Sequence, residues 1–388
     1  MVVSSNGHYD WAKELKEFDE TKAGVKGLVD VGVTKVPRLF VHPPETLQSR
    51  PKLDGVPLDL PTIDFQGLGA RRSEVVEEIR KAAGEWGFFR IVNHGFPLET
   101  MDAMLAAVKR FHEQPTEEKM PWYSADVRKQ VKFNSNLPSR ENDPASWRDL
   151  LSCVFNDDQL EPENLPLACR KEVLEYAKYM IELREIMAEL LSEALGLRSD
   201  YLSSIECMKS EALACLYYPR CPEPEKTLGT PKHSDTTFLT LLMQDSTGGL
   251  QILHDDHWID VPPVRGALIA NIGDLMQIIS NDKFISVEHR VVAQPVGPRI
   301  SVACFFTPSL KAAVKPFAPI KELLSDENPA VYREFMFRNI PNTTRQKARK
   351  LSRHCFVTRF DELFFIFFSQ NKFPVHYHET FAISNVSF

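Results

Sequence analysis

The front half of the chain carries apolar residues at the spacing of amphipathic helices. Apolar positions recur every three or four residues in four segments: residues 9–30, 73–86, 98–113 and 170–195. Residues 37–61 contain repeated prolines, which remove backbone donors and disfavour helix in the preceding residue, so this stretch predicts an extended connector. Two β-prone runs, 60–65 and 88–92, flank the second helix and predict short strands.

From about residue 210 the pattern changes to short β-rich runs separated by Gly, Pro, Asn and Asp. Seven strands are predicted: residues 213–218, 238–244, 250–253, 257–261, 267–272, 287–293 and 300–306. Short strands at near-regular spacing are typical of a sandwich or of a barrel of the jelly-roll kind. The chain is therefore predicted to be an α+β protein, with a double-stranded β-helix (jelly-roll) barrel supported by an α-helical N-terminal region.

These changes of pattern predict four parts. They are an N-terminal extension, a mostly helical N-terminal domain, a jelly-roll domain and a C-terminal segment, at residues 1–58, 59–208, 209–310 and 311–388. The last part is atypical after about residue 337, where a basic run precedes a phenylalanine-rich run at residues 360–368. That run is too short to span a membrane and would promote aggregation if exposed. We interpret this tail as a read-through or mis-spliced end.

The net charge limits the kinds of partner that the protein can bind, and the cysteine spacing bears on the redox state of its thiols. A net charge of -7 leaves no basic excess to neutralise phosphates, which argues against nucleic-acid binding. The N-terminus shows no secretory signal, and no apolar stretch reaches the ~18 residues of a membrane span. The seven cysteines are scattered without a CxxC pair, which favours reduced, mostly buried thiols. We expect a cytoplasmic, monomeric protein that acts on a small molecule, with no nucleic-acid or membrane partner.

Two histidines and one aspartate are candidate metal ligands. His233 and Asp235 are two positions apart, and on a strand such side chains point to the same face. His289 lies in a second β-prone run. Two histidines and one carboxylate form the facial triad of non-haem Fe(II) sites, which leaves coordination positions open. An HxD pair alone is a weak signal, and a histidine in a valine-rich strand is also compatible with a core imidazole bonded to a backbone carbonyl.

A candidate anion site follows ten residues after His289. Arg299 and Ser301 are again two positions apart on a predicted strand, and this distance predicts a hairpin return to the neighbouring strand. The planar guanidinium matches a carboxylate, and the adjacent hydroxyl adds a donor. A diacid such as 2-oxoglutarate could chelate the metal with its keto-acid end and meet Arg299 with its distal carboxylate. A surface arginine is the simpler interpretation of Arg299 alone, but the ordered combination of motifs favours the site.

Together these motifs resemble those of the plant 2-oxoglutarate/Fe(II)-dependent dioxygenase family. His-x-Asp, the later His and Arg-x-Ser match the family's pattern at His233, Asp235, His289, Arg299 and Ser301. The resemblance implies that the first three bind Fe(2+) and that the last two hold 2-oxoglutarate. It also implies O2 as a co-substrate and ascorbate as the reductant.

Three further segments carry the same resemblance. The Tyr-Tyr-Pro segment at 217–219 matches, and by resemblance Tyr218 reaches the 2-oxoglutarate carboxylate. Residues 85–95 resemble the family's N-terminal domain signature. The extension around 18–27 resembles the branch of ACC-oxidase homologues that includes deacetoxyvindoline 4-hydroxylase and the DIBOA-glucoside dioxygenases. The likeness spans roughly residues 9–336, and the long extension argues against ACC-oxidase activity itself.

What the resemblance implies is an oxidoreductase of specialised metabolism. Such an enzyme hydroxylates, demethylates or desaturates a small plant metabolite while 2-oxoglutarate is decarboxylated to succinate and CO2. The expected substrate-pocket residues are Phe133, Asn134, Leu216, Phe305 and Thr307. Phe305 could equally be barrel core, and Leu216 departs from the family's Asn or His. A leucine cannot donate a hydrogen bond, so it could loosen co-substrate orientation or enlarge the pocket.

Two alternatives to a working oxygenase stay open at the level of sequence. The atypical tail is compatible with a catalytically impaired, non-enzymatic homologue. The metal triad alone is also compatible with a cupin-like metal-binding protein that does not use 2-oxoglutarate.

Overall fold

The computed structural model describes residues 9–47, 59–126, 128–135 and 142–337. The sequence features assigned to the atypical tail, at residues 338–353 and 360–368, lie outside the described residues. Within the described ranges, the six cysteines are free and buried, and no helix combines the length and apolar composition needed to cross a bilayer.

The four predicted helices are confirmed, with one break. The α-helices are α1 (Trp11–Glu20), α2 (Gly24–Asp30), α3 (Pro44–Leu47), α4 (Leu68–Glu85), α5 (Leu98–His112), α6 (Thr116–Lys119), α7 (Arg170–Ala194), α8 (Tyr201–Ser204) and α9 (Asp274–Ile279). Short 3-10 helices lie at Arg38–Phe40, Met120–Trp122, Pro162–Asn164, Pro224–Lys226 and Lys321–Leu323. The predicted helix at 9–30 is divided because Lys22, between α1 and α2, adopts a positive φ angle of 54°, which the interior of an α-helix does not accommodate.

All seven predicted strands of the second half form. The strands are β1 (Thr62–Asp64), β2 (Phe88–Val92), β3 (Val131–Asn134), β4 (Asp149–Phe155), β5 (Ser210–Tyr218), β6 (Leu228–His233), β7 (Leu239–Gln244), β8 (Leu250–His254), β9 (His257–Asp260), β10 (Leu268–Ile272), β11 (His289–Val292), β12 (Arg299–Thr307), β13 (Pro316–Phe317) and β14 (Phe335–Met336). β3, β4, β13 and β14 were not predicted as strands, and for β6 only a strand at His233 was expected. The α+β prediction, with a barrel supported by helices, is confirmed.

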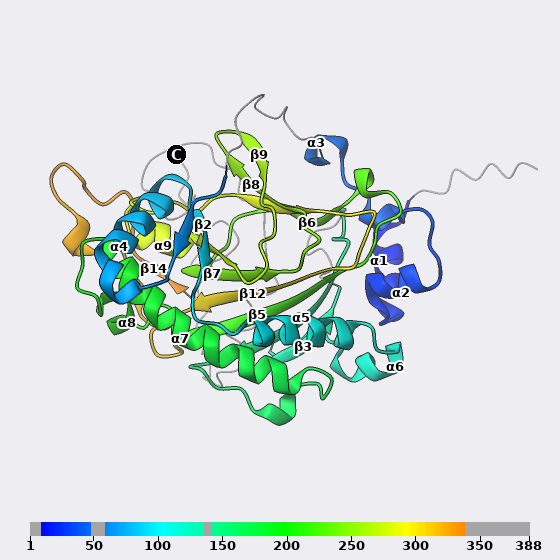
Figure 1. The fold of residues 1–388 in the computed structure, drawn as a ribbon. Helices are drawn as coiled ribbons and strands as arrows, with labels where there is room; N and C mark the ends of the chain where they lie inside the picture. Colours follow the sequence, from blue (N-terminus) through cyan, green and yellow to red (C-terminus); the bar gives the residue numbers. More distant parts are fainter. Residues whose placement is uncertain (1–8, 48–58, 127, 136–141, 338–388) are drawn as a thin grey trace, which may run out of the picture.

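Two facing sheets make the barrel. The large sheet has the order β1-β2-β10-β7-β12-β5-β4-β3, and the small sheet has the order β6-β11-β8-β9. Helices α5 and α7 cover the outer face of the large sheet, while β6 and β8 lie over its inner face (Figure 1). The large sheet takes β1–β4 from the front half of the chain and the rest from the second half. The proposed division between residues 208 and 209 therefore crosses one continuous sheet.

Both faces of the large sheet are buried, and this explains the sequence of β5. Every residue of β5 is buried. Leu213, Cys215 and Tyr217 belong to the core that contains the helices, whereas the alternating Leu216 and Tyr218 pack on the inner side. Because a strand covered on both faces packs against apolar groups on each side, residues 212–218 of β5 form a continuous apolar run, and only Ser210 and Glu211 at its start are polar.

The predicted hairpin between His289 and Arg299 is wrong. β11 pairs with β6 and β8 in the small sheet, whereas β12 pairs with β5 and β7 in the large sheet. The intervening segment therefore crosses from one sheet to the other. As a result, Arg299 and His289 are contributed to the barrel interior by opposite sheets and not by neighbouring strands.

Candidate metal centre

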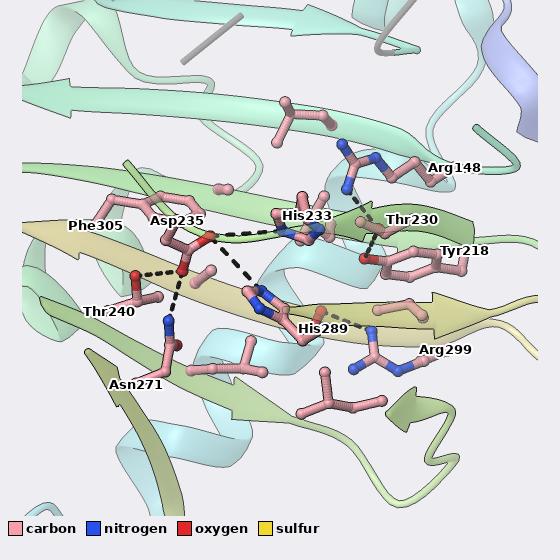
Figure 2. Close-up of a pocket in the computed structure, with 18 of the residues that line it drawn as sticks. Arg148, Tyr218, Thr230, His233, Asp235, Thr240, Asn271, His289, Arg299 and Phe305 are labelled. Atoms are coloured by element: carbon pink, nitrogen blue, oxygen red, sulfur yellow. Dashed lines mark hydrogen bonds and ion pairs between the residues drawn. The ribbon is translucent and has the colours of Figure 1, made fainter. Parts of the chain in front are cut away.

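The two candidate histidines are directly paired across the small sheet. His233 is the last residue of β6 and His289 is the first residue of β11, and the two are partners in the antiparallel register. Their ring centroids are 4.0 Å apart. Asp235 lies in the loop beyond the end of β6, so the prediction that it shares a strand with His233 is wrong. Figure 2 shows its carboxylate turned back toward both imidazoles.

The three side chains present their donor atoms to one point. Asp235 Oδ1 is 3.5 Å from His233 Nε2 and 3.6 Å from His289 Nε2. The three ligand atoms all lie within 4.8 Å of one another, and all three residues are buried. The donor set of two imidazoles and one carboxylate fits Fe(II), since it leaves part of the coordination sphere open.

Backbone contacts fix the orientation of both imidazoles. His233 Nδ1 lies 2.9 Å from the carbonyl oxygen of Pro231, and His289 Nδ1 lies 3.3 Å from that of Val287. A carbonyl accepts, so Nδ1 carries the proton in each ring. The lone pair of Nε2 is then free to bind a metal.

Two residues that the sequence analysis did not identify orient Asp235. Its Oδ2 accepts hydrogen bonds from Thr240 Oγ1 at 2.6 Å and from Asn271 Nδ2 at 2.7 Å, which leaves Oδ1 for the metal. Such outer contacts hold a ligand in place and tune its basicity. A usable signal existed in the sequence, because Asn271 is the one amide in the apolar strand β10, and a buried amide requires a partner.

The charges of the site suit metal binding at neutral pH. Burial raises the pKa of Asp235, but His289 and His233 outweigh it and hold the pKa below its usual value. Burial, with the nearby His233, lowers the pKa of His289 to about 4. The carboxylate is therefore ionised and His289 neutral, which are the forms that coordinate metals.

Arg299 occupies the same cavity, and the interpretation as a surface residue is wrong. It is 1% exposed, and its Nε donates to the carbonyl of Gly248 at 2.6 Å. Its Nη1 donates to Ser301 Oγ at 2.9 Å, and its Nη2 donates to Gln244 Oε1 at 3.1 Å. Its guanidinium lies 4.8 Å from the ring centroid of Tyr218, its register partner on β5. The three residues assigned to 2-oxoglutarate are thus brought together.

The cavity between the sheets contains the triad and an apolar wall. Its lining residues are Phe88, Arg148, Leu150, Ala214, Leu216, Tyr218, Thr230, His233, Asp235, Thr240, Leu242, Leu250, Asn271, His289, Val291, Arg299, Ser301, Ala303 and Phe305. Two of the five expected pocket residues, Leu216 and Phe305, are among them.

The other three expected pocket residues do not line this cavity. Phe133 pairs in register with Leu151, and both belong to the core on the helix side of the sheet. Asn134 is the last residue of β3, the edge strand beyond β4. Thr307 ends β12, where its Oγ1 is 3.5 Å from the carbonyl oxygen of Ser210. Position along the chain does not show which face of the sheet a residue lies on or which strands are neighbours.

Comparisons with known proteins agree with this site. Residues 209–308 match the model of the 2OG-Fe(II) oxygenase superfamily, and residues 60–173 match that of the non-haem dioxygenase in morphine synthesis N-terminal family. The chain is 50% identical over 323 residues to 1-aminocyclopropane-1-carboxylate oxidase homolog 1 of Arabidopsis thaliana, covering 82% of this chain and 88% of that protein. The chain belongs to the 2OG-Fe(II) oxygenase superfamily.

Further relatives of this 2OG-Fe(II) oxygenase support the same assignment. Homolog 6 of the same plant is 48% identical over 328 residues, covering 84% of this chain and 91% of that protein. The crystal structure of JOX2 in complex with 2OG, Fe and JA superposes with a TM-score of 0.71 at 31% identity, covering 81% of this chain and 90% of that chain. The predicted family, the dioxygenase class, and the requirement for Fe(II) and 2-oxoglutarate are therefore confirmed.

Proposed function

We propose that this oxygenase hydroxylates, demethylates or desaturates a small plant specialised metabolite, coupled to decarboxylation of 2-oxoglutarate to succinate and CO2. The observation that carries the proposal is that the metal triad, the Arg299–Ser301 pair and an apolar wall line one cavity. Relatives in Arabidopsis thaliana support the plant setting. We further propose a monomeric, cytoplasmic protein.

In this proposal each polar residue of the cavity has one role. His233, Asp235 and His289 would hold Fe(II), and Arg299 and Ser301 would bind the distal carboxylate of 2-oxoglutarate, assisted by the hydroxyl of Tyr218. Fe(II) with bound 2-oxoglutarate supplies the activation of O2 and the oxidation of a C–H bond. Ascorbate would keep the iron ferrous. The protein contributes binding, orientation and exclusion of water.

The wall beside the triad points to a substrate with an apolar portion. Leu150, Leu216 and Ala214 come from adjacent strands, and Phe305 and Leu242 continue the wall. Leu216, where the family usually has a polar residue, pairs with Leu150 across β4 and β5. A hydrogen-bonding group is thereby replaced by apolar surface, which favours an apolar substrate group at that position.

An anaerobic titration tests the proposal. Wild type and His233→Ala are each titrated with Fe(II) and 2-oxoglutarate, and the visible charge-transfer band of the chelate is followed. A band in the wild type alone supports the site, and metabolites are then screened by succinate release. No band in folded wild type would instead favour the catalytically impaired homologue. Activity that survives Arg299→Ala would favour a metal-binding protein that does not use 2-oxoglutarate.

A further inference from the structure

A second buried arginine lines the cavity, and no motif assigned it a role. Arg148 directly precedes β4, is 2% exposed and reaches the cavity beside Tyr218. Its Nη1 donates to Thr230 Oγ1 at 2.6 Å (Figure 2). A charged guanidinium in such a position is costly to bury unless it serves specific contacts.

Thr230 connects Arg148 to the tyrosine of the co-substrate site. Thr230 Oγ1 is 3.1 Å from the hydroxyl oxygen of Tyr218. Burial raises the pKa of Tyr218, but the charges of Arg148 and Arg299, together with hydrogen bonds from Thr230 and Arg148, bring it below its ordinary value. The phenol is therefore placed in the field of two guanidinium groups.

The donor and acceptor properties of these three groups fix the direction of the hydrogen bonds between them. A guanidinium can only donate, so Thr230 Oγ1 must accept from Arg148. The threonine proton is then available to the oxygen of Tyr218, which leaves the tyrosine proton for another acceptor. Donors in such a chain polarise one another and strengthen the terminal donor.

The N-terminal extension holds Arg148 in place from both sides along the chain. Trp147 packs against Phe40 of the extension, with ring centroids 5.3 Å apart. The Asp149 carboxylate accepts from the backbone N–H of Val25 at 2.8 Å. Side chains of successive residues in an extended chain point to opposite faces. Because these contacts hold Trp147 and Asp149 outside the barrel, Arg148 between them points into the cavity.

We propose that Arg148 is a positioning residue of the 2-oxoglutarate site. Through Thr230 it orients the Tyr218 hydroxyl to donate to the distal carboxylate, and its charge adds to that of Arg299 there. This inference rests on the proposed function, because it requires 2-oxoglutarate to lie in this cavity. It predicts that Arg148 matters for the distal carboxylate and not for the metal-chelating end.

Two ligands that differ only at the distal group separate the contribution of the distal carboxylate to binding from that of the metal-chelating end. The full-length Fe(II) protein is titrated anaerobically with 2-oxoglutarate and with 2-oxopentanoate, which has the same chain length but ends in a methyl group. Dissociation constants are read from the chelate band and require no turnover. We expect Arg148→Met to weaken 2-oxoglutarate binding roughly tenfold, as for a lost charge-assisted contact, and to change 2-oxopentanoate binding by less than about twofold.

Two variants of Thr230 test whether Arg148 acts through the threonine hydroxyl. They also keep the inference testable if Arg148→Met does not fold. Thr230→Ser keeps the hydroxyl and is expected to bind 2-oxoglutarate like wild type, whereas Thr230→Val is expected to lose affinity for 2-oxoglutarate alone. Equal weakening of both ligands, or no effect in Arg148→Met and Thr230→Val, would overturn the inference while leaving the proposed function intact. No chelate band in the wild type would overturn both.

Discussion

Glu211 is a fully buried carboxyl group on the helix side of the large sheet. Its Oε2 is 4.0 Å from Cys304 Sγ, and its Oε1 has no hydrogen-bond partner among the described residues. Burial raises the pKa of Glu211 to about 8, although the nearby Arg184 opposes the shift. The folded protein therefore retains a proton near neutral pH that the unfolded chain, with an ordinary glutamate pKa near 4.5, has released.

The sign of the resulting pH dependence follows from this difference in bound protons. Between about pH 4.5 and 8 the folded state binds more protons than the unfolded state, so the free energy of unfolding falls as pH rises. The slope approaches about 1.4 kcal/mol per pH unit. Glu211→Gln removes the ionisation, and relative to wild type it should gain about 2.5 kcal/mol between pH 5.5 and 7.5.

Urea denaturation of the metal-free protein at several pH values measures this gain. Other titrating groups, including buried histidines, contribute equally to both proteins and cancel in the difference. Glu182→Gln, on the exposed side of α7, is the matched control and should follow the wild-type pH dependence. A difference between Glu211→Gln and wild type that does not change with pH would show that Glu211 carries no shifted proton, and the reasoning would be refuted.

Three further predictions concern the site and its support. Asn271→Ala should weaken Fe(II) binding roughly tenfold to hundredfold, measured by Fe(II) titration, because Asp235 Oδ2 loses one of its two donors. Gly229→Ala should raise the KM for 2-oxoglutarate more than it changes kcat, since the added Cβ would lie 2.7 Å from the ring of Tyr218. Gly24→Ala should lower the free energy of unfolding by about 1–3 kcal/mol in urea denaturation, because φ is +72° and its Cβ would meet the Asp149 carboxylate at 2.5 Å.

The sequence could identify the polar residues of the site but not the path of the chain between them. His289 and Arg299 are recognisable because ligating or charged groups stand within β-prone apolar runs, and His233 is recognisable because Asp235 follows two positions later. Strand order is a long-range property, so the local spacing of ten residues suggested a hairpin where the chain crosses between sheets. Strand order also explains why Thr240 was missed, and although Asn271 stands out as an amide in an apolar strand, only the folded sheet shows that its partner is Asp235.

The failure to predict β4 and β6 as full strands has a physical reason in each case. β4 is buried at every position because it lies between β5 and β3 under the helices, and its apolar run lacks the alternation that marks a half-exposed strand. β6 contains Pro231, which cannot donate to a ladder and masked the strand that carries His233.

The correction at Asp235 changes how the triad is understood. The two histidines come from the small sheet, whereas Asp235 is held by Thr240 of β7 and Asn271 of β10, both in the large sheet. The donor set is therefore assembled across the barrel and not on one strand. A loop carboxylate without those two contacts would be free to rotate, so the geometry of the metal centre depends on the packing of one sheet against the other.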